Sequence, residues 1–145
     1  MADETEGMDV RIAEILGTDS ELDFGEARQR FFEYLQQHLE MPCEVTGSED
    51  FRWEEFYVFG PGDEAEYAEL RRTQPSFQDR YELLSIELAG SSRWMLFSDD
   101  IMANCRRASD GREFQLGLSE LEATRQSSAN YQLLLDYSTW FVNSR

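Results

Sequence analysis

Lysine is absent from the 145-residue chain, and all thirteen of its positive charges are arginines. A nucleotide-binding P-loop and a Schiff-base enzyme both need a lysine amine, so both kinds of chemistry are excluded. Positive charge is scarce as well, because thirty Asp and Glu residues give a formal net charge of −17. A field of that sign repels nucleic-acid phosphates and anionic lipids, and it attracts cations and basic protein surfaces. We therefore expect no nucleic-acid partner and no membrane partner.

Histidine and cysteine are also rare, with His38, Cys43 and Cys105 as the complete set. Three scattered residues are too few for a zinc site, and any hydrolase triad would depend on His38 alone. We predict a structural His38 in the last turn of a helix and two buried thiols, with a regulatory disulfide as the alternative. A glycosidase needs only two carboxylates, but among thirty acids no pair stands out. We expect a protein without catalytic activity.

Long apolar runs are missing, and none approaches the roughly 18 residues that a membrane span requires. The first ten residues, MADETEGMDV, lack the basic start and the apolar centre of a signal peptide. We therefore expect a cytoplasmic location. Hydrophobic residues nevertheless make up 41% of the chain, which is enough to form the core of one domain of this length.

The hydrophobic pattern predicts a single compact α+β domain over residues 20–145, after a flexible N-terminal segment over residues 1–19 whose second half can form a short helix. A long helix is expected between Ser20 and Pro42, with Ser20 as its N-cap and Asp23 in the capping-box position. Asn130 is the expected N-cap of a C-terminal helix. Between the two helices we expect an antiparallel sheet of about five or six strands and one short helix. The strands are predicted at 43–46, 55–59, 80–88, 93–97, 101–107 and 112–118, and the short helix at 63–72.

Acidic residues gather at three of the predicted turns, where they are candidate metal ligands. The sequence around Asp110-Gly111 does not form an EF-hand loop, because Arg106 and Ala108 stand where that loop needs acids. A hard cation such as Ca²⁺ can still be bound by oxygen ligands from separate loops. The candidate ligands are Glu49, Asp50, Glu54, Glu55, Asp63, Glu64, Asp99 and Asp100.

Strand geometry ranks these candidates. The cluster around residues 49–55 comes first, and Asp63 and Glu64 can approach it if residues 55–59 run back along the sheet. In such a strand, Glu54 and Glu55 point to opposite faces, so they serve one ion only if the strand begins after them. The pair Asp99 and Asp100 comes second.

Four segments, in this order along the chain, resemble the CcbP-type calcium-binding proteins. They are MPCEVTGSEDFRWEEFYVFG (41–60), SFQDRYELLSIE (76–87), WMLFSDDIMANCRRASDGREFQLGLSELEA (94–123) and NYQLLLDYSTWFVN (130–143). The resemblance covers roughly residues 24–143. It implies a compact α+β domain that binds Ca²⁺ without EF-hands, through surface carboxylates, as a calcium buffer or sensor. It assigns no individual ligands, because the coordinating residues of that family form no compact motif in this sequence.

Two other interpretations of the acidic composition stay open. The chain can be an interaction module that binds a basic protein partner, with Phe51 and Trp53 as aromatic anchors between the acids. It can also be the acidic domain of a halophilic cell, in which the carboxylates serve solubility and no ion site exists.

Overall fold

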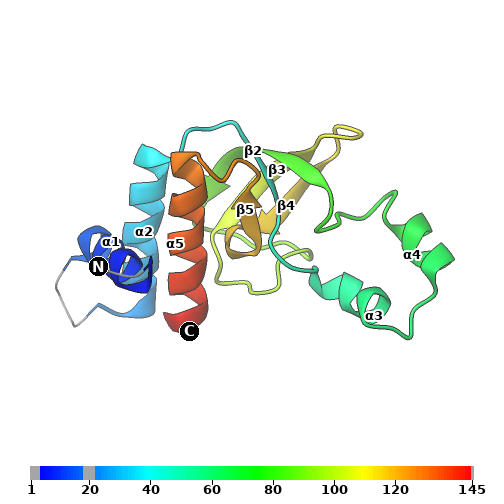
Figure 1. Ribbon diagram of the computed structural model, residues 1–145, viewed down its shortest axis with the longest axis horizontal. Helices are drawn as coiled ribbons and strands as arrows, with labels where there is room; N and C mark the ends of the chain where they lie inside the picture. Colours follow the sequence, from blue (N-terminus) through cyan, green and yellow to red (C-terminus); the bar gives the residue numbers. More distant parts are fainter. Residues whose placement is uncertain (1–3, 18–21, 145) are drawn as a thin grey trace.

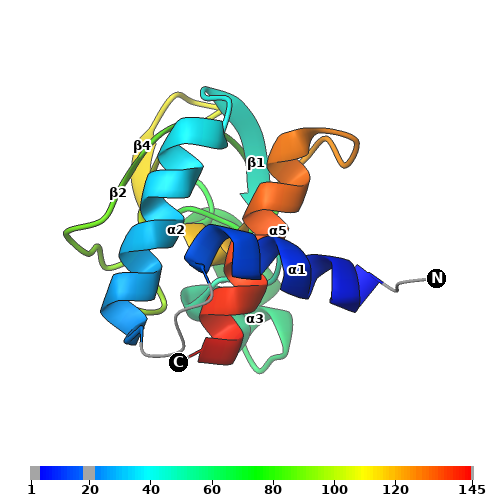
Figure 2. The same ribbon diagram turned by 90° about the vertical axis from the view of Figure 1, so that its left-hand side faces the viewer.

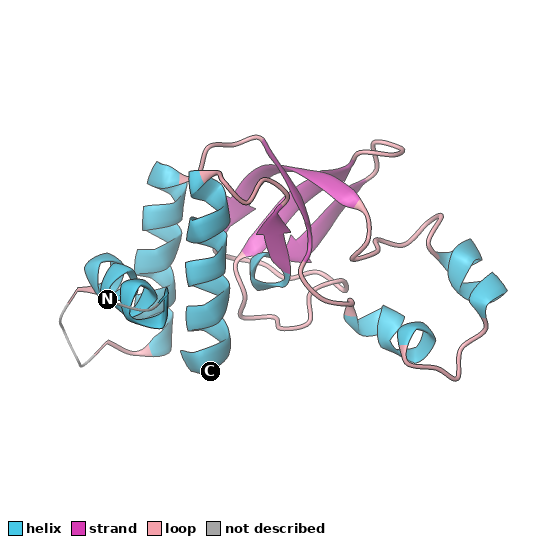
Figure 3. Ribbon diagram, in the orientation of Figure 1, coloured by secondary structure: helices cyan, strands magenta, loops and turns pink. Residues whose placement is uncertain are grey.

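Five strands form one antiparallel sheet at the centre of the protein, and two long helices cover one of its faces (Figures 1 and 3). The structure is a computed structural model that describes residues 4–17 and 22–144. The strands lie in the order β4-β3-β2-β1-β5. They are β1 (Cys43–Gly47), β2 (Arg80–Glu87), β3 (Met102–Arg107), β4 (Glu113–Gly117) and β5 (Leu121–Ala123). The helices are α1 (Glu4–Leu16), α2 (Phe24–His38), α3 (Glu55–Val58), α4 (Glu64–Leu70) and α5 (Ala129–Ser144). The α+β fold class, with an antiparallel sheet and a C-terminal helix, is confirmed.

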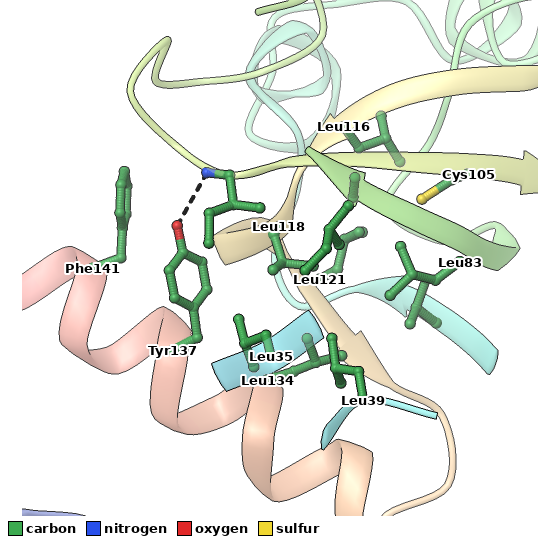
Figure 4. Close-up of a cluster of buried hydrophobic side chains, with 14 of the residues drawn as sticks. Leu35, Leu39, Leu83, Cys105, Leu116, Leu118, Leu121, Leu134, Tyr137 and Phe141 are labelled. Carbon is green, nitrogen blue, oxygen red and sulfur yellow. Dashed lines mark hydrogen bonds between the residues drawn. The ribbon is translucent and has the colours of Figure 1, made fainter. Parts of the chain in front are cut away.

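The core lies between the sheet and the pair α2 and α5 (Figure 4). Alternate residues of each strand point inward, as the pleat requires, and β2 shows how this alternation is adjusted. Tyr81, Leu83 and Ile86 are its buried side chains, and the change from odd to even positions falls at a bulge after Leu83. The extra residue keeps Ile86 in the core, because one inserted position turns the following side chains to the opposite face.

Helix α2 begins later than its sequence pattern suggests. Asp23 itself is the N-cap, and its carboxylate accepts a hydrogen bond from the amide of Glu26 at 2.8 Å. The predicted cap, Ser20, lies outside the described residues. His38 occupies the last turn of α2, as predicted, where a basic side chain complements the helix dipole.

The start of α5 corrects a second predicted cap. Asn130 lies inside the helix and is buried, and its side-chain amide bonds both the N–H and the C=O of Glu40 at 3.0 and 2.9 Å. It therefore joins the beginning of α5 to the segment that follows α2. Ser128 lies where a cap is expected, since its hydroxyl accepts a hydrogen bond from the amide of Tyr131.

Two predicted strands are wrong. Residues 55–58 form the single turn of α3 instead and Phe59 is its C-cap, because Tyr57 stacks on Tyr67 of α4 at 5.4 Å between ring centroids. Residues 93–97 form consecutive turns, closed by hydrogen bonds from Met95 N–H to the Ser92 carbonyl and from Asp100 N–H to the Phe97 carbonyl. Short aromatic runs satisfy strand preferences in the sequence, but here tertiary contacts select another conformation.

Helix α1 lies across α2 and α5 (Figure 2). Ile12, Ile15 and Leu16 pack against the core, and Arg11 forms an ion pair of 2.8 Å with the buried carboxylate of Asp136. The predicted boundary between a flexible segment and the domain falls among residues 18–21, outside the described residues. Within the described part of the chain, no helix combines the length and the apolarity needed to cross a bilayer.

The two cysteines lie on either side of β2. Cys43 of β1 and Cys105 of β3 both pair with Leu83, so two strand spacings, about 10 Å, separate their backbones. A disulfide needs Cα atoms within about 7 Å, and both thiols are free. The alternative of a regulatory bond between them is therefore wrong. Burial raises the pKa of the Cys105 thiol to about 12, which leaves it protonated and unreactive.

Candidate metal centre

A groove of about 470 Å³ runs between the end of β1, the turn after β4 and the C-terminal half of α5. We call it the acidic groove, because three carboxylates lie along it. It is lined by Ser48, Glu49, Asp50, Leu96, Phe97, Ser119, Glu120, Leu135, Ser138, Thr139, Val142 and Asn143. The hydrogen bond from Ser48 N–H to the Glu120 carbonyl, 2.9 Å long, holds two walls of the groove together.

At one wall, Glu120 meets the buried carboxylate of Asp100 beside Gly117. A Cβ atom added at Gly117 would lie 2.6 Å from Asp100 Oδ2 and 2.5 Å from Glu120 Oε2. Both oxygens therefore pack against Gly117, where any side chain would collide with them, and they are at most about 5 Å apart. Two oxygens that each lie 2.3–2.6 Å from one Ca²⁺ ion are themselves no more than about 5 Å apart. Two oxygens within that distance are close enough to contact one calcium ion.

Asp100 is held rigidly in this position. Tyr137 of α5 donates its hydroxyl to Oδ1 at 2.7 Å, and the Ser119 hydroxyl donates to Oδ2 at 2.6 Å. The Tyr137 oxygen in turn accepts a hydrogen bond from the Ile101 amide at 3.1 Å (Figure 4). These contacts fix one carboxylate of the pair, whereas among the described residues the Glu120 carboxylate accepts a single hydrogen bond, from the Leu96 amide at 3.1 Å. Glu120 is therefore the freer of the two side chains.

Burial disfavours the ionised form of both carboxyl groups. It raises the pKa of Asp100 to about 6, although the hydrogen bonds from Ser119 and Tyr137 oppose the shift. Burial also raises the pKa of Glu120 to about 7, and the neighbouring charge of Asp100 adds to the increase. Within the described residues, neither carboxylate has an ion pair with an arginine. Two adjacent negative charges thus lack a cation.

These shifts predict how the stability of the metal-free protein depends on pH. Both pKa values are higher in the folded protein than in the unfolded chain, where such groups titrate near 4. The folded state then binds more protons between about pH 4 and pH 7, so its stability falls as pH rises through that range. We expect a lower thermal unfolding midpoint at about pH 8 than at about pH 5.5, and a smaller difference in Glu120→Gln, whose amide does not titrate.

The control for this measurement is Glu113→Gln, an exposed position on β4 that removes the same formal charge. Glu113→Gln should keep the pH dependence of the wild type. Because Glu113→Gln and Glu120→Gln reduce the general charge repulsion equally, a smaller pH dependence in Glu120→Gln alone reports on the Glu120 carboxyl group. Differential scanning calorimetry at several pH values makes the comparison. Equal slopes for Glu120→Gln and the wild type would contradict the prediction.

The predicted ligands are distributed over three places. Glu49 is exposed and Asp50 half-buried, and both line the acidic groove together with Glu120. Asp100 belongs to the pair at Gly117. Asp99 is half-buried next to it, and its carbonyl oxygen accepts a hydrogen bond from Arg28 at 2.7 Å.

Glu54 does not line the groove and is completely buried. Its oxygens accept hydrogen bonds from Phe51 N–H, Phe77 N–H, Ser76 Oγ and Tyr67 Oη, at 3.3, 2.8, 2.7 and 2.6 Å respectively. All four donors to the Glu54 carboxylate are groups of the protein itself. The side chain serves the fold in this structure, and the sequence cluster 49–55 is not brought together.

Glu55, Asp63 and Glu64 lie on a part of the chain that stands off the body. We call residues 55–70 the acidic arm; it consists of α3, the turn at 60–62 and α4, on the side of the sheet opposite α1, α2 and α5 (Figure 1). Asp63 is the N-cap of α4, and its carboxylate accepts from Glu66 N–H at 3.0 Å. Glu55 and Glu64 are exposed.

Among residues 4–17 and 22–144, no three Asp, Glu, His or Cys side chains converge on one point as a complete metal site. The pair at Gly117 brings two carboxylates together. Glu120 was not among the sequence candidates, although a signal for it existed. In the β3–β4 hairpin Met102 pairs with Gly117, so the residues just before β3 and just after β4 must be neighbours. Asp100 and Ser119-Glu120 occupy those positions.

Two solved structures share this fold. The chain is similar to a solved structure described as a calcium-binding protein in the calcium-binding form, with a TM-score of 0.59 and 19% identity over 99% of this chain and 97% of that one. It is also similar to the crystal structure of Anabaena CcbP, with a TM-score of 0.56 and 20% identity over 100% of this chain and 94% of that one. No protein-family model and no curated protein matches the sequence. The CcbP-type fold implied by the four sequence segments is thereby confirmed.

Proposed function

We propose that the protein binds Ca²⁺ in the acidic groove, with Asp100 and Glu120 as the central ligands. The observation that carries the proposal is the proximity of the Asp100 and Glu120 carboxylate oxygens, which meet beside Gly117. A divalent cation between them removes the repulsion and provides the charge that no arginine supplies. The solved relatives by fold, one described as a calcium-binding protein and the other as CcbP, support the same ion.

Further ligands come from the rim of the groove. Ca²⁺ takes six to eight oxygen ligands in flexible geometry, and Asp100 and Glu120 supply at most four. Glu49 and Asp50 line the same groove as Glu120, and side-chain movements toward Glu120 would add their carboxylates, with water completing the shell. In this arrangement Asp100, held by its hydrogen bonds, is the rigid ligand, and Glu49 and Asp50 move to coordinate the ion.

The chemistry of the donors favours calcium over magnesium. Mg²⁺ requires a tight octahedron at about 2.1 Å and keeps most of its water, so ligands on separate segments suit it poorly. The net charge of −17 raises the local cation concentration at any ionic strength, and salt screens that attraction. We propose a binding role as a buffer or sensor, in which affinity falls as salt rises.

Calorimetric titration of the chelator-treated protein tests this assignment. We expect heat of binding with Ca²⁺, little with Mg²⁺, and a loss of calcium affinity of about tenfold or more in Glu120→Gln, because the amide retains the shape and removes one anionic ligand. Asp100→Asn should weaken binding similarly, and circular dichroism checks that its hydrogen-bonded environment still folds.

The matched control is the double variant Glu55→Gln/Glu64→Gln on the acidic arm. It removes twice the charge of Glu120→Gln, at exposed positions outside the groove. Its calcium affinity should stay within about twofold of the wild type, the change expected from the weaker general field. Equal heats with both ions, or wild-type affinity in Glu120→Gln, would refute the proposed site.

A further inference from the structure

Three large apolar side chains on the acidic arm are exposed to solvent. The exposed fractions are 53% for Phe56, 42% for Val58 and 77% for Phe59. The expected aromatic anchors lie elsewhere, because Phe51 is only 2% exposed and Trp53 is half-buried, with its indole N–H donated to the Pro75 carbonyl at 2.7 Å. We call Phe56, Val58 and Phe59 the arm patch. Clustered apolar exposure of this kind marks interaction surfaces more often than isolated surface residues do.

The arm that carries this patch is a built structure. Tyr57 and Tyr67 stack with an interplanar angle of 10°, and the Tyr57 hydroxyl donates to Glu66 at 2.7 Å. Gly62 closes the turn by donating its N–H to the Phe56 carbonyl at 2.9 Å. A Cβ at Gly62 would lie 2.4 Å from the Tyr57 ring, so the turn fits closely against α3. These contacts keep the arm patch exposed to solvent, whereas Tyr57 and Tyr67 of the same arm pack against each other.

Every charged side chain of the acidic arm itself is acidic, and Arg72, just beyond the arm, pairs with Glu69 at 3.3 Å. Between residues 55 and 70 the chain has no arginine and five exposed acids. These acids are Glu55, Asp63, Glu64, Glu66 and Glu69. Such a rim repels an anionic bilayer, and it also repels the same arm of a second copy. Positively charged side chains complement it.

We propose that the acidic arm is a docking surface for a basic amphipathic segment of another protein. Apolar side chains of that segment would cover Phe56, Val58 and Phe59, and its lysines or arginines would meet the acidic rim. The recognition resembles other helix-in-groove and aromatic-anchor interfaces, in which a few apolar residues supply most of the affinity and charge selects the partner. The proposal uses none of the groove residues and is independent of calcium binding.

A fluorescein-labelled amphipathic peptide of leucine and lysine is the probe, measured by fluorescence anisotropy with the full-length protein at physiological ionic strength. We expect affinity to fall about tenfold in Phe56→Ser/Phe59→Ser, because these are the anchors of the patch. Phe59→Ser alone, the most exposed position, should weaken binding severalfold without any loss of packing. Val10→Ser, which is 58% exposed on α1, is the matched apolar control and should bind normally.

The charge component has its own pair of variants. Glu55→Gln/Glu64→Gln should weaken peptide binding severalfold, whereas Glu14→Gln/Glu113→Gln, which removes the same charge from α1 and β4, should have little effect. Equal binding by Phe56→Ser/Phe59→Ser and Val10→Ser, together with equal binding by the two charge variants, would show that the peptide follows net charge alone and would overturn the proposal. So would a dimer that Phe59→Ser disperses in sedimentation velocity, or binding of the arm to phosphatidylcholine vesicles in preference to the peptide.

Discussion

Replacement of Glu54 by alanine is expected to lower the free energy of unfolding by about 3 kcal/mol or more. The reason is that four donors lose their only shared acceptor in a site without exposure to water. The donors come from the arm (Tyr67) and from the segments on both sides of it, so the change should also loosen the arm. Glu54→Gln should lower the free energy of unfolding by a smaller amount. The amide oxygen can still accept hydrogen bonds, whereas the NH₂ group replaces the second acceptor with a donor.

Urea denaturation followed by circular dichroism measures the loss, and near-ultraviolet signals report on the aromatic contacts of the arm. The control is Glu55→Ala, the next residue, which is exposed and should change stability by less than about 0.5 kcal/mol. A cost below about 1 kcal/mol for Glu54→Ala would mean that water or other groups replace the lost acceptor.

Replacement of Arg107 by alanine is expected to have a similarly large effect, about 3–5 kcal/mol, because it removes one partner of a buried charge network. The Arg107 guanidinium is 2% exposed and donates to the carbonyls of residues 71, 72 and 74 at 2.9–3.2 Å. It also donates to the carboxylates of Asp79 and Asp110 at 3.2 and 2.7 Å. One side chain therefore joins the end of the arm to the β3–β4 turn.

The adjacent Arg106 provides the comparison. It is exposed and forms one ion pair of 2.7 Å with Glu82, so Arg106→Ala should cost no more than about 1 kcal/mol. The hydrogen bonds from Arg107 also lower the pKa of Asp110 to about 2. The stability that this carboxylate contributes is present above about pH 4 and is lost as pH falls toward 2, so Arg107→Ala should flatten that acid limb. Equal losses in the two arginine variants would contradict the assigned network.

Periodic patterns predicted the elements that pack against a single core. The apolar face of residues 24–38 and that of 129–144 each repeat at helical spacing, and the Asp110-Gly111 pair marks the hairpin that joins β3 to β4. Segment 55–59 was misassigned, because five residues rich in aromatics fit a strand as well as a helical turn. Its conformation depends on Tyr67, ten residues further along the chain, which no local pattern includes.

The candidate site was predictable in part. Asp100, Glu49 and Asp50 were recognised as acids at turns, and the structure places all three in or beside the acidic groove. The same rule selected Glu54, which the structure buries among its own donors, because sequence does not distinguish a carboxylate that faces solvent from one that satisfies backbone amides. Glu120 was missed, since only the register of the hairpin brings it to Asp100.

The amino-acid sequence by itself determined the fold class, the excess of negative charge and the absence of lysine chemistry, because these follow from composition and local periodicity. Tertiary structure alone decided which few of the thirty acids are buried and adjacent. It also turned Phe56 and Phe59 outward while it enclosed Phe51. The physical reason is that burial and proximity are properties of strand pairing and packing, in which residues distant along the chain fix the environment of each side chain.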